Sequence, residues 1–121
     1  MKIYVSHSNQ LDYENDLYIP IRQSRLNSEH KFVLPHEGGQ NINSKEEIKS
    51  SDLFIAEVSF PSTGSGIEIG WAESFGIPLL FIYKKGNKVP GSLKFLSGEF
   101  LEYENSDDFI EKITNYLENI S

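Results

Sequence analysis

A glutamate at position 68 follows a loop of hydroxyl and glycine residues, a combination that suits chemistry at a sugar. Segment 59–68 reads SFPSTGSGIE, with Ser62, Gly64 and Gly66 immediately before Glu68. Glycines in such a loop let a ligand approach the backbone closely. A carboxylate can attack the anomeric carbon of a sugar and hold the sugar covalently until an acceptor arrives. The segment therefore points to transfer of a glycosyl group.

A purely structural role for Glu68 is also open. We expect a helix from about Ser65 to Phe75, which places Glu68 in its opening turn. A carboxylate there gains ~0.3–1 kcal/mol from the helix dipole without any catalytic role. The small residues before Glu68, and Gly70 after it, favour catalysis because they leave space above the carboxylate.

Two other loops carry side chains that can serve the same site. Ser6, Ser8 and Asn9 follow the first apolar run, and His36 follows the second, where it can transfer protons. Tyr4 lies inside the first run, near enough to its end for the hydroxyl to reach the loop. We expect no metal site, because the histidines and acids lack the spacing of metal ligands, and we expect no cofactor.

The elements that must position these residues alternate along the chain. Apolar runs predict five strands, at 2–6, 31–34, 53–58, 79–83 and 100–103, and helical patterns predict helices at about 12–26, 44–50, 65–75 and from 106 onward. Alternation of this kind predicts an α/β fold of three layers, with a mainly parallel sheet and helices on both faces. We predict the flavodoxin-like (Rossmann-like) strand order 2-1-3-4-5, whose switch point brings the loops after residues 6 and 58 together.

Local signals set the predicted ends of the helices. Ser44 and Glu47 have the spacing of a capping box, and Ser106 is the expected cap of the last helix. Gly76, followed by Pro78, is the expected end of the central helix. Glu57 lies in an apolar strand, so we expect its carboxylate to be paired or at a sheet edge.

Length and charge narrow the class of protein. The 121 residues predict a single domain, 1–121, and the net charge of −7 disfavours binding to a nucleic-acid polymer. We expect no membrane partner, because no apolar stretch approaches the ~20 residues of a bilayer span. The strand-like start and the absence of cysteine lead us to expect a cytoplasmic protein without a signal peptide.

The segment from Asp52 to Tyr83, DLFIAEVSFPSTGSGIEIGWAESFGIPLLFIY, resembles the core motif of the nucleoside 2-deoxyribosyltransferase-like superfamily. It is most similar to the branch of 2'-deoxynucleoside 5'-monophosphate N-glycosidases. The resemblance implies that Glu68 is the nucleophile and that the Tyr4 hydroxyl orients it. It further implies a small-molecule nucleoside or nucleotide as partner and assembly into a homodimer or larger homo-oligomer. The implied phosphate contacts are Ser8, Ser62 and, from a neighbouring subunit, Ser92.

The chain departs from that superfamily at two positions. Ser44 stands where relatives have a catalytic aspartate, and Asn9 or Gln10 stands where they have a phosphate-binding arginine. Loss of a charge-assisted hydrogen bond weakens anion binding by ~1.5–3 kcal/mol. Three alternatives follow: a different nucleoside or nucleotide substrate, Glu47 or His36 as the acid, or binding without turnover.

These observations leave two hypotheses of different class. The first is an N-glycosidase or deoxyribosyltransferase-like enzyme that cleaves the bond between a base and a (deoxy)ribose through Glu68. The second is a catalytically inactive nucleotide-sensing module that keeps the pocket but lacks the acid.

Overall fold

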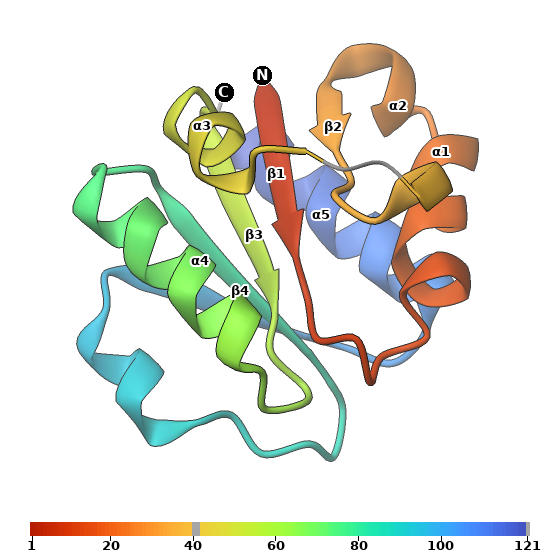
Figure 1. The fold of residues 1–121 in the computed structure, drawn as a ribbon. Coiled ribbons are helices and arrows are strands. Elements are labelled where there is room, and N and C mark those ends of the chain that lie inside the picture. The colour runs from red at the N-terminus through yellow and green to blue at the C-terminus, as the bar shows by residue number, and fades with distance from the viewer. Residues whose placement is uncertain (40–41, 121) are drawn as a thin grey trace.

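A five-stranded, all-parallel sheet of order β2-β1-β3-β4-β5 forms the centre of the molecule (Figure 1). The structure is a computed structural model, and it describes residues 1–39 and 42–120. The strands are β1 (Lys2–Ser6), β2 (Lys31–Val33), β3 (Leu53–Glu57), β4 (Leu79–Lys84) and β5 (Gly98–Tyr103). The predicted fold class and strand order are therefore confirmed.

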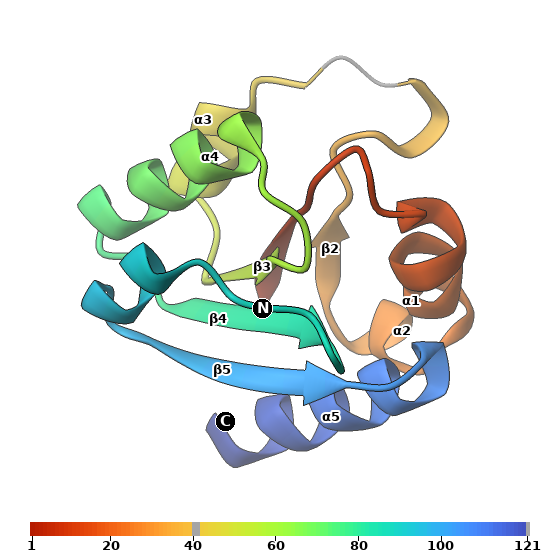
Figure 2. The same ribbon diagram turned by 90° about the horizontal axis from the view of Figure 1, so that it is seen from below.

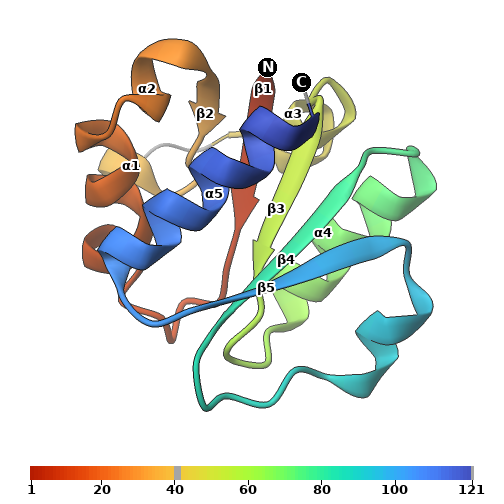
Figure 3. The ribbon, with the colours of Figure 1, turned by 180° about the vertical axis from the view of Figure 1, so that it is seen from behind.

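Helices cover both faces of this sheet (Figures 1 and 2). One face carries α3 (Ser44–Lys49) and α4 (Thr63–Ser74). The other carries the π-helical turn η1 (Glu14–Tyr18), α1 (Ile19–Gln23), α2 (Leu26–Glu29) and α5 (Ser106–Ile120), as Figure 3 shows from behind. None of the described helices is long and apolar enough to cross a membrane.

Alternation along β1 decides which side chains face α4. Ile3 and Val5 belong to the core shared with α1 and α5, whereas Tyr4 belongs to the core shared with α3 and α4. Because side chains alternate along a strand, Ser6 lies on the same face as Tyr4. The hydroxyls of both residues therefore point toward α4.

The predicted helix over 12–26 is instead three short pieces. In η1 the backbone N–H of Ile19 donates to Glu14 O, and Pro20 then sits in the first turn of α1. A proline has no N–H to continue an α-helical ladder, and the first turn needs none. The helix ends at Gln23, because Ser24 adopts an extended conformation (φ −89°, ψ 163°).

Two predicted N-caps are wrong by one residue. The side chain of Asn43, not Ser44, accepts the backbone N–H of Glu46 at 3.2 Å and caps α3. Asn105 likewise accepts the N–H of Asp108 at 2.9 Å, which leaves Ser106 inside α5.

The end of α4 follows its prediction. Gly76 has φ 73°, and its N–H donates to Glu73 O while that of Ile77 donates to Ala72 O. This is the hydrogen-bonding pattern of a glycine-terminated helix.

The connection between β4 and β5 contains only the 3-10 turn η3 (Gly91–Phe95). Another short 3-10 segment, η2 (Glu37–Gly39), follows β2. The β4–β5 connection therefore has no long helix that could cover the neighbouring part of the sheet in the way that α4 covers β3 (Figure 2).

Candidate active site

Glu68 projects from the second turn of α4, not from the opening turn that we predicted. The helix begins at Thr63, after the cap Ser62, whose hydroxyl accepts the N–H of Ser65 at 3.2 Å. The helix dipole stabilises carboxylates mainly in the first turn, so it contributes little to the stability of a carboxylate at position 68. The purely structural account of Glu68 is weakened accordingly.

Both oxygens of the Glu68 carboxylate accept a hydrogen bond from β1. The Tyr4 hydroxyl donates to Oε2 at 2.6 Å, and the Ser6 hydroxyl donates to Oε1 at 2.9 Å. Ser6 Oγ also lies 2.8 Å from Ser65 Oγ, and since its proton points to Glu68, Ser65 is the donor in that pair. Two hydroxyls therefore fix the orientation of the carboxylate without neutralising its charge.

The phenol of Tyr4 remains a donor in this arrangement. Burial, and then the hydrogen bond to Glu68, raises the pKa of Tyr4 well above its usual value of 10.0. The Ser44 hydroxyl acts in the opposite direction on this pKa. The proton between Tyr4 and Glu68 thus stays on the tyrosine near neutral pH.

Glu68 opens into a cavity of about 460 Å³. Its lining comes from the loops after β1 and β2 and from the starts of α3 and α4: His7, Asn9, Pro35, His36, Ile42, Ser44, Ser62, Gly64, Ser65 and Glu68. The site lies at the carboxyl edge of the sheet, where β1 and β3 adjoin and where the connections diverge to opposite faces (Figure 1). Open α/β folds bind small molecules at this point, in pockets of about 300–1,000 Å³.

A buried histidine forms one wall of the cavity. His7 Nδ1 lies 3.1 Å from Ser8 O, and a carbonyl only accepts, so Nδ1 carries the proton. Its Nε2, 2.7 Å from the Tyr18 hydroxyl, is then the acceptor. Burial lowers the pKa of His7 from 6.5 to about 4, so this ring is neutral at pH 7.

His36 lies against His7 within a cluster of rings. The ring centroids of His7 and Tyr13 are 4.4 Å apart and stacked, and that of His36 lies 5.4 Å from His7. The Tyr18 hydroxyl connects the two histidines, because it donates to His7 Nε2 and also accepts a hydrogen bond from the backbone N–H of His36 at 3.1 Å. Since both nitrogens of His7 are engaged, His36 is the better placed of the two histidines for proton transfer in the cavity.

The structure brings together most of the predicted site residues. Tyr4, Ser6 and Glu68 are hydrogen-bonded, and four other predicted residues line the cavity: Asn9, His36, Ser62 and Gly64. No lysine or arginine is among the described residues that line it.

Four predicted residues lie elsewhere. Glu47 forms an ion pair with Lys2 at 2.9 Å, at the opposite, amino end of β1, so the structure argues against it as the acid. Ser8 is buried, and its hydroxyl accepts the N–H of Gln10. Gly66 is exposed and does not line the cavity, since α4 turns it away from Glu68. Ser92 lies in η3, outside the cavity of its own chain.

Ser65 is one of the hydroxyl residues of the predicted glycine-rich loop, whereas Tyr13 and Tyr18 were not predicted to contribute to the site. Ser65 supports Ser6, and Tyr13 and Tyr18 hold the histidine cluster. The sequence signal for Tyr13 and Tyr18 is weak, because residues five apart do not share a face of an α-helix; here Tyr18 ends the π-helical turn η1, and Tyr13 directly precedes it. Within residues 1–39 and 42–120, no three histidines or acids lie close enough to hold a metal ion.

Fold and site together define a Rossmann-like protein with a hydrogen-bonded carboxylate at the switch point. No protein-family model matches the sequence. A curated protein of Syntrophotalea carbinolica, described as "Putative 2'-deoxynucleoside 5'-phosphate N-hydrolase 1", is 49% identical over 45 residues, which make up 37% of this chain. That match spans only about a third (32%) of the length of the curated relative.

A solved structure resembles the whole chain. The CMP N-glycosidase BcmB of Clostridium botulinum superposes with a TM-score of 0.68 and 19% sequence identity, over 94% of this chain and 99% of that one. At this identity the likeness establishes a shared fold. Both names fit the nucleoside 2-deoxyribosyltransferase-like superfamily, in agreement with the resemblance of segment 52–83.

Proposed function

We propose that this protein is an N-glycosidase or deoxyribosyltransferase-like enzyme. It would cleave the bond between base and (deoxy)ribose in a nucleoside or nucleoside 5'-monophosphate. The observation that carries the proposal is the Glu68 carboxylate, oriented by Tyr4 and Ser6 and open to a cavity at the switch point. The names of the two similar proteins support the same reaction class.

The reaction would take place in two displacements at C1' of the sugar. An oxygen of Glu68 attacks C1' while the bond from C1' to the base nitrogen breaks, and the base leaves with that electron pair. His36, which lines the cavity, is the candidate to give the departing base a proton. Water or a second base then attacks C1', and the bond to Glu68 breaks to restore the carboxylate. The attacking molecule gives up a proton to His36, which replaces the proton that went to the departing base.

A panel of deoxynucleosides and their 5'-monophosphates tests the proposal, with free base measured by chromatography. We expect release from at least one substrate and its loss in Glu68→Ala. Glu73→Ala is the matched control, because Glu73 is exposed on the same helix. Release that survives in Glu68→Ala would contradict the assigned nucleophile.

One observation favours the second candidate function, a nucleotide-sensing module without turnover. Ser44 lines the cavity where the resemblance places a catalytic aspartate, so a carboxylic acid is absent from that position. In the same assay this candidate gives no free base from any substrate, yet shows saturable binding of a nucleoside or nucleotide. Assembly into a homodimer or larger oligomer, with Ser92 reaching a neighbouring site, stays a prediction.

A further inference from the structure

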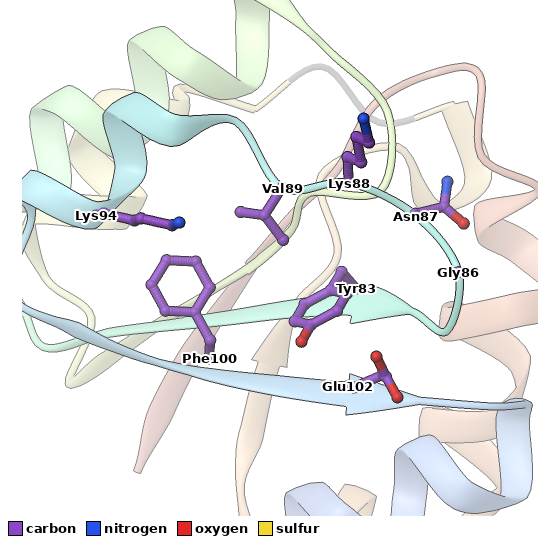
Figure 4. Close-up of a pocket in the computed structure, with 8 residues that line it drawn as sticks. All are labelled: Tyr83, Gly86, Asn87, Lys88, Val89, Lys94, Phe100 and Glu102. Carbon is purple, nitrogen blue, oxygen red and sulfur yellow. The ribbon is translucent and has the colours of Figure 1, made fainter.

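A second cavity, of about 630 Å³, lies beside the carboxyl ends of β4 and β5 (Figure 4). Its lining residues are Tyr83, Gly86, Asn87, Lys88, Val89, Lys94, Phe100 and Glu102. None of these lines the Glu68 cavity, whose walls come from β1, β2 and the starts of α3 and α4. The two cavities are therefore separate.

This cavity exists because the β4–β5 connection contains only η3. Tyr83 on β4 pairs in register with Glu102 on β5, and Phe100 lies two residues before Glu102 on the same face. Tyr83 and Phe100 stay half-buried, so aromatic surface remains open to solvent between the strands and the connection.

The aromatic wall is held rigidly from behind. The ring of Phe100 stacks on that of Phe81, with centroids 4.8 Å apart. Phe81 in turn occupies space over Gly98, where a Cβ atom would approach its ring to 2.7 Å. The lining is thus a preformed flat surface, as a ligand with an aromatic ring requires.

Two lysines give the cavity positive charge in a protein of net charge −7. Lys88 and Lys94 make no ion pair with any described acid, whereas the neighbouring Lys84 binds Asp16 at 2.7 Å and Lys85 binds Glu104 at 3.2 Å. In Figure 4 the side chain of Lys94 extends toward Val89 and Phe100. The side chain of Lys88 instead points away from Tyr83 and Phe100. An unpaired ammonium group beside an aromatic wall, as at Lys94, suits a ligand that is both flat and anionic.

Two acceptors lie at the end of the cavity away from Lys94 (Figure 4). Glu102 lies next to Tyr83 in Figure 4 and makes no ion pair within the described residues. The Asn87 side-chain amide donates to Ser59 O at 3.1 Å, which leaves its own oxygen available. These oxygens can accept from an amino or hydroxyl group of a ligand.

We propose that this cavity is a second small-molecule site, for a flat aromatic molecule with an anionic substituent. Its ring lies against Tyr83 and Phe100, and its anionic group binds Lys94. A nucleoside monophosphate and an aromatic carboxylic acid share this chemistry. The inference does not depend on catalysis by Glu68.

An NMR titration with 2-naphthoate, and separately with the neutral 2-naphthamide, tests this site. We expect naphthoate to shift the amide signals of residues 83–102 in a saturable way, and the amide to bind roughly tenfold more weakly because it lacks the charge. Adenosine 5'-monophosphate, added to Glu68→Ala to prevent turnover, distinguishes the two sources. Shifts over 83–102 assign a nucleotide to this site, and shifts only around the Glu68 cavity assign the site to aromatic acids.

Variants of the lysines test the assigned contacts. Lys94→Ala should weaken naphthoate binding several-fold, up to roughly tenfold, and Lys88→Ala, whose side chain points away from the rings, should weaken it less. Lys45→Ala should not, since that amine lies over the Trp71 ring, 5.7 Å from its centroid. Val89→Trp, which fills the cavity, should abolish binding.

Three results would overturn the proposal. They are absence of naphthoate shifts over 83–102, equal affinity for acid and amide, and equal weakening by Lys45→Ala. A native-like NMR spectrum establishes that each variant is folded. Should Val89→Trp fail to fold, the two lysine variants still decide the outcome.

Discussion

Tyr4 and Ser6 occupy alternate positions of β1, so their hydroxyls reach one carboxylate together. Each donates to a different oxygen of Glu68, at 2.6 and 2.9 Å. A carboxylate held in this way loses little orientational freedom before it meets a sugar carbon. The two residues are positioning residues, because they act through Glu68.

Tyr4→Phe should lower kcat/KM for base release by roughly tenfold to a hundredfold. The phenylalanine keeps the ring in its buried place but removes a hydrogen bond to a charged group, which contributes about 1.5–3 kcal/mol. Steady-state kinetics on the best substrate measure the change. Tyr116→Phe, on α5 and outside both cavities, is the control and should leave kcat/KM unchanged. A similar loss in both variants would contradict a specific role for Tyr4.

The buried His7 should make stability depend on pH. Its pKa in the folded chain is lowered to about 4, mainly by burial, from the usual 6.5. Between these values the unfolded chain binds the additional proton, so the free energy of unfolding falls as the pH falls from about 6.5 toward 4. The difference between these two pKa values corresponds to about 3 kcal/mol in the free energy of unfolding. That stability is present in full above pH 6.5 and is lost as the pH falls toward 4.

Urea unfolding of the wild type and His7→Gln between pH 4 and 8 measures this effect. Glutamine cannot titrate, so the variant should lose most of the dependence over that interval, although its stability at pH 7 falls. His30→Gln, at the far end of the sheet, should keep the wild-type dependence. Identical slopes in the wild type and His7→Gln would show that His7 protonates as readily in the folded chain as in the unfolded one.

The choice of the capping residue of α3 affects the candidate active site. Either Asn43 or Ser44 could cap α3, since both residue types accept a hydrogen bond from a helix N–H. The structure uses Asn43, and Ser44 is then free to line the cavity. A shift of one residue at a helix start thus places a hydroxyl in the candidate active site.

Gly98 is the residue on which the β4–β5 pair depends most directly. In Gly98→Ala the new Cβ would lie 2.7 Å from the ring of Phe81 and 3.1 Å from Leu79 O. Overpacking of this kind costs about 1–3 kcal/mol in the free energy of unfolding, which urea denaturation measures. Gly91→Ala is the matched control, because no atom lies within 4 Å of its added Cβ. Equal stability of the two variants would show that Phe81 moves aside freely.

Across the molecule, one buried acid connects three strands. Glu57 on β3 is 1% exposed. Its Oε1 accepts a hydrogen bond from the backbone N–H of Ser59. Its Oε2 accepts hydrogen bonds from the Ser59 hydroxyl and from the hydroxyl of Tyr103 on β5. The Ser59 hydroxyl also accepts the N–H of Lys84 on β4 at 2.8 Å. Burial raises the pKa of Glu57, and these hydrogen bonds oppose that rise. Of the two alternatives expected for Glu57, hydrogen-bonded pairing is the one that the structure shows, since β3 is not at a sheet edge.

Tyr103→Phe should lower the free energy of unfolding by about 1–3 kcal/mol. The substitution keeps the buried ring but deprives a buried carboxyl group of a donor. Thermal or urea unfolding measures the loss. Tyr116→Phe, on α5 and only half-buried, should change stability by less. A larger effect at position 116 would contradict the importance of the Glu57 network.

The strand order and the choice of Glu68 as candidate nucleophile could both be predicted from the sequence alone. The alternation of apolar runs with helical patterns specified five strands, and the parallel order followed because sequential βα units must cover both faces of a sheet. The glycine-rich loop singled out Glu68, and the placement of loops at the switch point brought Asn9, His36 and Ser62 to it. These features are encoded locally, or follow from general rules of topology.

Which side chains meet in the site depends on the folded chain and could not be predicted from the sequence. The sequence left both Glu47 and His36 as candidate acids, and the fold sends Glu47 to Lys2 at the amino end of β1 while His36 lines the cavity. Strand register and helix phase set such distances, and an error of one residue in either turns a side chain to another face. The hydroxyl pair on Glu68, the ring cluster around His7 and the second cavity all depend on contacts between distant segments, which no local pattern specifies.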